Sequence, residues 1–181
     1  TSILYTWWLG SQAGKAIADV LFGDHNPSGR LPMSFPRAIG QAPIYYNHFN
    51  TGHAGASDMD MNYVTGYIDL RNSPRYPFGF GLSYSTFMYG DLRLDKNSMH
   101  AKDSVTASIT VTNSSQYDGT ETVQLYIRDV AASAIRPVKE LKKFRQVTLK
   151  AGESKTVNFT LTADDLKFYN SRLQYVYEPG E

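Results

Sequence analysis

The spacing of hydrophobic residues divides the chain into a helical N-terminal part, an irregular middle and a strand-rich second half. Near the N-terminus, the run Ile3–Leu9 is apolar and strand-like, and Gly10 ends it. Gly23 supplies the left-handed residue that ends a helix, and Pro27 prevents an immediate restart. Between Gly10 and Gly23, apolar residues recur at the helical period and form one stripe. They are Ala13, Ala16, Ile17, Val20 and Leu21. We expect one strand–turn–helix unit, and because such a unit cannot bury its own faces, the rest of an α/β layer must come from elsewhere.

From residue 91 onward the hydrophobic period becomes two, which is typical of antiparallel strands with one buried face. The turn signals Asp118-Gly119 and Ala151-Gly152 lie between the alternating runs. The alternating runs are 105–112, 122–128 and 157–162. Together with Leu92–Leu94, Phe144–Leu149 and Leu173–Tyr177, these runs predict about six strands, close to the seven of an immunoglobulin-type sandwich. The expected inner face consists of Val105, Ala107, Ile109, Val111, Val123, Leu125, Ile127, Val157, Phe159 and Leu161.

The middle of the chain, residues 24–90, shows little periodicity because prolines repeatedly interrupt it. Residues 41–90 nevertheless hold eleven of the twenty-four aromatic residues. Disordered segments are poor in aromatic residues. The composition therefore predicts an ordered loop that packs on another surface.

Both ends of the sequence predict a segment of a longer chain. A buried strand rarely opens a chain, and the turn Pro179-Gly180 should lead to a further strand, yet only Glu181 follows it. Unpaired strand edges and large apolar patches promote association. We expect these edges to pair with a complementary part of the same protein or, failing that, with a second copy as a homo-oligomer.

The composition excludes several classes of protein. Hydrophobic residues make up 41% and charged residues 19%, an ordinary globular balance. The net charge of +1 gives no field for binding a nucleic acid or an anionic membrane, and no apolar run is long enough to span a bilayer. The absence of cysteine excludes disulfides, thiol catalysis and thiolate zinc sites.

Two patterns resemble ligand sites only loosely. The segment Gly10–Ala16 is one residue short of a phosphate-binding loop and lacks its Ser or Thr, so a glycine-bracketed helix entry is the preferred interpretation. A metal cluster drawn from His48, His53, Asp58 and Asp60 lacks the spacing of strong metal sites. Solvated loop residues are the preferred interpretation there, and we expect no metal site and no cofactor.

Polar residues in the second half have structural interpretations. Asp164-Asp165 follow Thr162 in a Thr-x-x-Asp pattern that predicts a capped short helix leading into Phe168, rather than an acid/base pair. Asn113-Ser-Ser115 and Asn158-Phe-Thr160 match the glycosylation pattern, which is frequent by chance. A basic stretch interleaved with apolar residues predicts an edge segment that covers apolar surface, not a polyanion site; it contains Arg136, Lys139, Lys142, Lys143 and Arg145.

Three long motifs carry a resemblance to a known family. They are Ala16-Ile-Ala-Asp-Val-Leu-Phe-Gly-Asp24, Asn26-Pro-Ser-Gly-Arg-Leu-Pro-Met-Ser-Phe-Pro36 and Tyr76-Pro-Phe-Gly-Phe-Gly-Leu-Ser-Tyr84. Through Arg136-Pro-Val-Lys-Glu-Leu-Lys142 and Glu178-Pro-Gly180 the similarity extends over essentially the whole chain. The sequence resembles the C-terminal part of glycoside hydrolase family three enzymes, in particular bacterial periplasmic β-glucosidases.

The resemblance implies a mixed fold, namely the end of an α/β sandwich domain followed by an all-β fibronectin type III-like, immunoglobulin-like sandwich. Residues 1–37 would be the C-terminal strand and helix of the α/β domain, and residues 38–85 an aromatic-rich connecting loop. Residues 86–181 would be the fibronectin type III-like domain without its last strand. The partners would be the remaining barrel and α/β sandwich domains, and the location periplasmic or secreted.

The resemblance also implies a function for the parent protein, hydrolysis of terminal β-linked glucose from oligosaccharides or glucosides with retention. Retention requires two carboxyl groups about 5–5.5 Å apart. In the family, the nucleophilic Asp lies on the barrel and the acid/base Glu lies upstream of the matched segment. We therefore expect no catalytic residue here and an inactive isolated chain; no substrate-binding residue is assigned. Family members usually carry Glu-Gly at the position of Gln12-Ala13, so no role of that Glu transfers.

Two other interpretations of the sequence remain open. The chain could be a self-standing β-sandwich module that binds carbohydrate or protein through its aromatic loop. Against this, half an α/β layer and a missing last strand make little sense in an independent module. A purely structural spacer differs from both by predicting no exposed aromatic surface.

Overall fold

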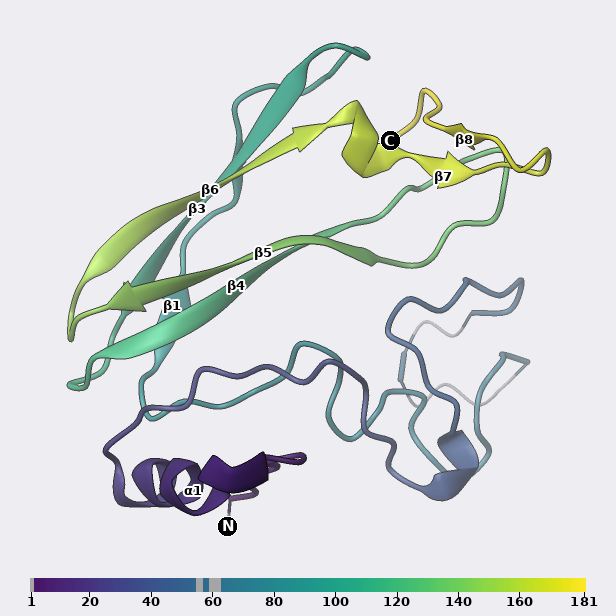
Figure 1. Cartoon of the computed structure of the whole chain (residues 1–181). Coiled ribbons are helices and arrows are strands. Elements are labelled where there is room, and N and C mark those ends of the chain that lie inside the picture. The colour runs from purple at the N-terminus through teal and green to yellow at the C-terminus, as the bar shows by residue number, and fades with distance from the viewer. Residues whose placement is uncertain (1, 55–56, 59–62) are drawn as a thin grey trace.

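The structure is a computed structural model that describes residues 2–54, 57–58 and 63–181. An N-terminal helix and a long irregular segment lie against one side of a two-layer β-sandwich (Figure 1). The described elements, in chain order, are η1 (Gly10–Gln12), α1 (Ala13–Phe22), η2 (Ile39–Gln41), β1 (Phe87–Tyr89), β2 (Arg93–Leu94), β3 (Ser104–Asn113), β4 (Gly119–Ile127), β5 (Glu140–Leu149), β6 (Ser154–Thr162), η3 (Ala163–Leu166), β7 (Phe168–Tyr169) and β8 (Tyr175–Val176).

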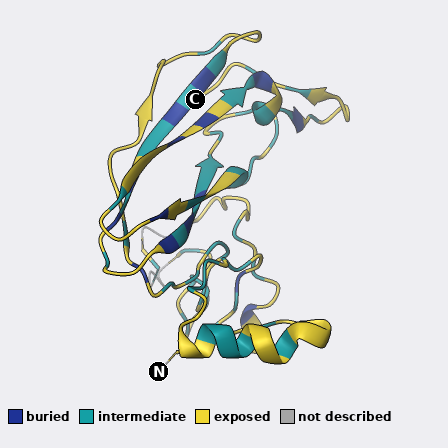
Figure 2. Ribbon diagram, turned by 60° about the vertical axis from the view of Figure 1, so that its left-hand side comes forward, coloured by how far each residue is buried: buried dark blue, intermediate teal, exposed yellow. Residues whose placement is uncertain are grey.

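The predicted helix is present and ends where the sequence indicates. Gly23 has φ 88° and donates its backbone N–H to the carbonyl of Val20, which is a left-handed helix end. Gly10 also has a positive φ, 63°, and lies at the entry to the helix. No residue of α1 is fully buried, and much of its surface is exposed (Figure 2).

The prediction of a strand over Ile3–Leu9 is wrong for this chain. No strand is assigned there, and Trp7 has φ 52°, which departs from extended backbone. A strand forms when its backbone groups pair with a neighbour. The described part of the chain offers these residues no such neighbour.

The sandwich has two antiparallel layers. In one layer β3 pairs with β6 along its whole length and with β1 and β2 on its other edge, whereas the second layer is the β4–β5 pair. A core cluster fills the space between them and consists of Val111, Val123, Leu149, Val157 and Phe159.

The predicted inner face is confirmed in its main part. Six of its residues are buried, namely Val105, Ala107, Val111, Val123, Val157 and Phe159. The other members, Ile109, Leu125, Ile127 and Leu161, are half-buried. Leu149 was missing from the prediction. It is fully buried, because its position at the end of β5, paired with Gly119 on β4, directs its side chain into the core.

The predicted cap at Thr162 is confirmed. The backbone N–H of Thr162 donates to the Asp165 carboxylate at 2.8 Å, which forms a capping box at the start of η3. The helix stops at Leu166, however, and Phe168 enters the short strand β7, which pairs with β8. Pairing with Val176 on β8 gives the Phe168 backbone a partner that a longer helix would remove.

The irregular segment is ordered by hydrogen bonds between distant parts of it. The backbones of Leu31 and Phe35 bond to those of Phe80 and Tyr76, so two irregular runs lie side by side. Gln41 is 1% exposed, and its side chain bonds to backbone groups on both sides of a loop. These hydrogen bonds join the described residues of the irregular segment to one another.

Candidate functional site

The strongest candidate site is the surface where the irregular segment between α1 and β1, residues 24–86, packs on strand β4. The ring of Tyr46 stacks on Phe78 with centroids 4.0 Å apart, and both rings meet the edge of Tyr126 from β4. Burial raises the pKa of Tyr126 above its usual value, with a smaller effect from Tyr46. The backbone N–H of Leu141 donates to the Tyr46 hydroxyl at 3.3 Å. These contacts place the segment directly against the sandwich.

Gly79 allows the closest approach between the segment and β4. Its carbonyl accepts a hydrogen bond from the Gln124 side-chain amide at 3.0 Å. Its φ is 80°, and an added Cβ would lie 2.3 Å from Gln124 Oε1. A side chain at this position would strain the backbone and push the segment away from the sheet.

A buried ionic cluster makes a second contact between the segment and the sandwich. The Arg30 guanidinium pairs with the Glu121 carboxylate, and their side chains are only 12% and 8% exposed. The Tyr89 hydroxyl donates to the other Glu121 oxygen at 2.7 Å. Burial, followed by the hydrogen bond to Glu121, raises the pKa of Tyr89 well above its usual range. Beside this cluster, Thr122 donates its hydroxyl to the carbonyl of Ser28.

Other aromatic rings of the segment are exposed. Tyr45 is 63% exposed although its neighbour Tyr46 is stacked, and Phe49 and Tyr63 are also exposed. The two tyrosines are neighbours in the sequence, and the position of Tyr126 distinguishes them. The segment therefore has one set of rings that hold it in place and one set that is free in this chain.

Two of the four residues considered for a metal site, Asp58 and His48, have other partners. The Asp58 carboxylate accepts hydrogen bonds from the Ser73 hydroxyl and backbone N–H, and these bonds hold the pKa of Asp58 below its usual value. His48 places Nδ1 3.0 Å from the carbonyl of Phe49. Asp60 lies outside the described residues. Among the residues that the structure describes, no group of three metal-ligating side chains is found.

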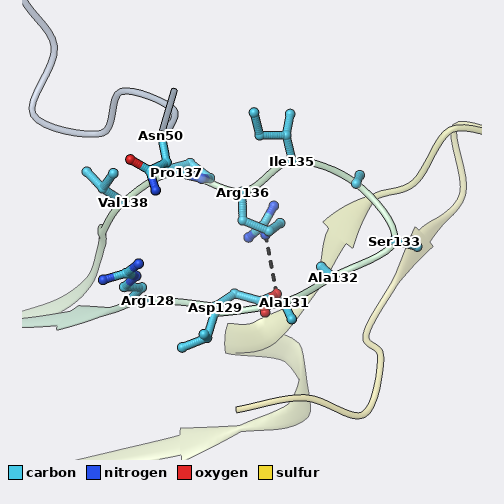
Figure 3. A pocket seen from close by; sticks show the side chains of 12 residues that line it. Asn50, Arg128, Asp129, Ala131, Ala132, Ser133, Ile135, Arg136, Pro137 and Val138 are labelled. Atoms are coloured by element: carbon cyan, nitrogen blue, oxygen red, sulfur yellow. Dashed lines mark ion pairs between the residues drawn. The ribbon is translucent and has the colours of Figure 1, made fainter. Parts of the chain in front are cut away.

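A groove of about 300 Å³ lies along residues 128–138, beside Asn50 (Figure 3). Arg136 projects into this region and pairs with Asp129, at 3.5 Å, and with Glu140. Its guanidinium also lies 4.5 Å from the centroid of the Phe168 ring. Arg136 is thus engaged in holding the loop and is not itself presented to a ligand.

The basic stretch behaves as predicted. Lys143 pairs with Asp165, and Lys139 lies over the ring of Tyr126. Arg145 lies over Phe159 in the same way. These cations cover apolar surface and neutralise acidic neighbours.

The two glycosylation patterns differ in accessibility. Asn113 is fully buried, and its amide donates to the carbonyls of Tyr117 and Leu149. Asn158 is exposed but lies within the ladder of β6, opposite Ser108. Asn113 is therefore a structural residue. Among the described helices, none has the length and hydropathy needed to cross a bilayer.

Comparison with known proteins places both halves of the chain. Residues 1–84 match the glycosyl hydrolase family 3 C-terminal domain, and residues 121–181 match the fibronectin type III-like domain. The chain is 50% identical to the periplasmic beta-glucosidase of Salmonella typhimurium, across 99% of this chain and 24% of that protein. It is 46% identical to a beta-xylosidase of Formosa agariphila, again over 99% of this chain and 24% of the relative.

The solved structures agree with the sequence relatives. A beta-glucosidase from Listeria innocua in complex with glucose superposes with a TM-score of 0.89 and 46% identity, covering 96% of this chain and 24% of that one. The beta-D-glucoside glucohydrolase of Trichoderma reesei gives a TM-score of 0.68 at 26% identity. The chain therefore spans only about a quarter of the length of these proteins.

Proposed function

Because the chain belongs to glycoside hydrolase family 3, we propose that it is the C-terminal portion of a retaining β-glucosidase that releases terminal β-linked glucose from oligosaccharides or glucosides. The observation that supports this most strongly is the 50% identity to a periplasmic beta-glucosidase along nearly the whole chain. The same relative supports a periplasmic location.

In this proposal the chain supports the enzyme and supplies no catalytic carboxylate. Residues 1–37 are the end of the α/β sandwich domain, residues 38–85 connect it to the next domain, and residues 86–181 are the fibronectin type III-like domain. The buried contacts of Arg30, Tyr46 and Phe78 with the sandwich support a rigid connection. Part of residues 38–85 then approaches the active-site rim, with Tyr45 as the ring available for contact with sugar.

The remaining domains are the proposed partner of the N-terminal apolar surface. Ile3 is 74% exposed, Trp8 96% and Phe22 84%, so each of these large apolar side chains is open to solvent in this chain. Soluble monomers rarely keep large uncovered apolar patches. A chain that spans 24% of its relatives has a natural candidate to cover this surface, the upstream part of the same enzyme.

The proposal is tested on the full-length protein with aryl β-glucoside and aryl β-xyloside. The rate on the glucoside should exceed that on the xyloside, and proton NMR should show β-glucose as the first anomer released. Release of the α-anomer would contradict retention. A clear preference for the xyloside would instead assign the protein to the activity named for the Formosa agariphila relative.

A further inference from the structure

Strands β7 and β8 form a hairpin at one end of the sandwich that carries two exposed tyrosines (Figure 1). Tyr169 and Tyr175 lie directly opposite each other in the pairing register. Their ring centroids are 4.9 Å apart, and the ring planes are tilted by 38°. Tyr169 is 66% exposed and Tyr175 54%. The pair therefore presents aromatic surface to solvent instead of filling a core.

The hairpin holds the two rings on a rigid support. The residue before Tyr169 is Phe168, which is 4% exposed and stacks under the Arg136 guanidinium. The turn is closed by the Asn170 carboxamide oxygen, which accepts the backbone N–H groups of Arg172 and Gln174. The backbone N–H of Asn170 donates to the carbonyl of Gln174. A binding surface that is fixed in advance loses less entropy when a ligand binds.

The chemistry around the rings fits a neutral ligand with many hydroxyl groups. The Asn170 amide donates to the Gln174 side-chain oxygen at 3.4 Å within the turn, and each tyrosine carries a hydroxyl that can donate or accept. Lys167 pairs with Asp164, so its charge is compensated where it approaches the Tyr175 ring. A β-linked glucose unit has equatorial hydroxyls and apolar C–H faces. Those faces pack on aromatic rings while the hydroxyls reach the neighbouring polar groups.

We propose that Tyr169 and Tyr175 form a surface that binds soluble β-glucan chains. This inference rests on the proposed function, because a β-glucosidase benefits from holding the polymer whose ends it cleaves. The 38° tilt between the rings favours a twisted soluble chain over the flat surface of crystalline cellulose. The surface binds sugar and makes or breaks no covalent bond.

The experiment uses the full-length enzyme in native gels cast with mixed-linkage β-glucan, with dextran or with no polymer. The β-glucan should retard the enzyme and dextran should not. Y169A and Y175A should each weaken the apparent affinity by about tenfold, since one aromatic contact is lost. Y169W keeps an aromatic ring at this position and should be retarded like the wild type. The matched control is Y117A, which removes a tyrosine of the same 66% exposure on another turn and should behave as wild type.

The outcomes separate this inference from the proposed function. Hydrolysis of an aryl β-glucoside is assayed beside retardation in the wild type and in every hairpin variant, as the separate readout of the proposed function. Retardation of an inactive wild type by β-glucan that is lost in Y169A and Y175A would contradict the proposed function and leave the glucan surface standing. Equal retardation of wild type, Y169A and Y175A would overturn the inference. The inference would also be overturned if β-glucan did not retard the wild type and Y169A had a lower melting temperature. The rings would then pack against another part of the enzyme.

Discussion

Removing Arg30 should destabilise the chain more than removing any exposed cation. Arg30 and Glu121 are almost fully buried, so Arg30→Ala leaves the Glu121 carboxylate in the interior with only the Tyr89 hydroxyl bound to it. Removal of one partner of a buried ion pair costs about 3–5 kcal/mol, because the remaining charge is desolvated without compensation. A stability of about 5–15 kcal/mol is typical of a domain, so this loss is a large fraction of the total.

The measurement is urea unfolding followed by circular dichroism and by tyrosine fluorescence, with coincident transitions required for a free energy of unfolding. The double variant Arg30→Met with Glu121→Leu should be more stable than Arg30→Ala, because it leaves no unpaired charge. Lys15→Ala is the control, since it removes an exposed ion pair with Asp19 and should leave the midpoint nearly unchanged. Equal midpoints for Arg30→Ala and Lys15→Ala would refute the reasoning.

Three further predictions concern the core, a titration and the aromatic segment. Ile109→Lys should unfold the sandwich, since it forces a charge against the core cluster and also loses part of the about 1.5–3 kcal/mol that full burial of an Ile contributes, whereas Thr110→Lys on the exposed face should leave the melting temperature unchanged. The pKa of Tyr89 is raised above 10.0 by burial and by Glu121, so the unfolded chain loses this proton first as the pH rises. Above pH 10, wild type should therefore lose stability more steeply than Tyr89→Phe; parallel curves in pH-dependent urea unfolding would contradict this. In the full-length enzyme, Tyr46→Ala should lower the melting temperature, with a stability loss of about 1–3 kcal/mol, and Tyr45→Ala should raise KM without changing stability. Lost stability in Tyr45→Ala would instead indicate packing.

The long strands could be predicted from the sequence because their period of two follows directly from one buried face. The two-residue strand β7 could not, since two residues show no period. Its existence depends on β8, which pairs with it across the turn from Asn170 to Gln174. The strand predicted over Ile3–Leu9 failed for the related reason that composition alone does not supply a neighbour to pair with.

The contacts that residues 24–86 make with the sandwich could not be predicted from local sequence patterns. Arg30 and Glu121 are 91 residues apart in the chain, and no sequence pattern around either residue indicates that they pair. The stacked Tyr46 and the exposed Tyr45 are adjacent, and the irregular segment has no period that would assign them to opposite sides. The family motifs Asn26–Pro36 and Tyr76–Tyr84 did mark the ordered part of this segment, because these are the two runs that lie side by side.

Fragment complementation tests most directly whether this chain is the supporting part of a larger glucosidase. Residues 1–181 and the upstream part of the same enzyme are purified separately and assayed with an aryl β-glucoside, alone and mixed. The account predicts no turnover by residues 1–181 and recovery of activity on mixing, as the upstream part covers the apolar surface around Trp8 and Phe22. Turnover that stays with residues 1–181 through further purification would contradict it.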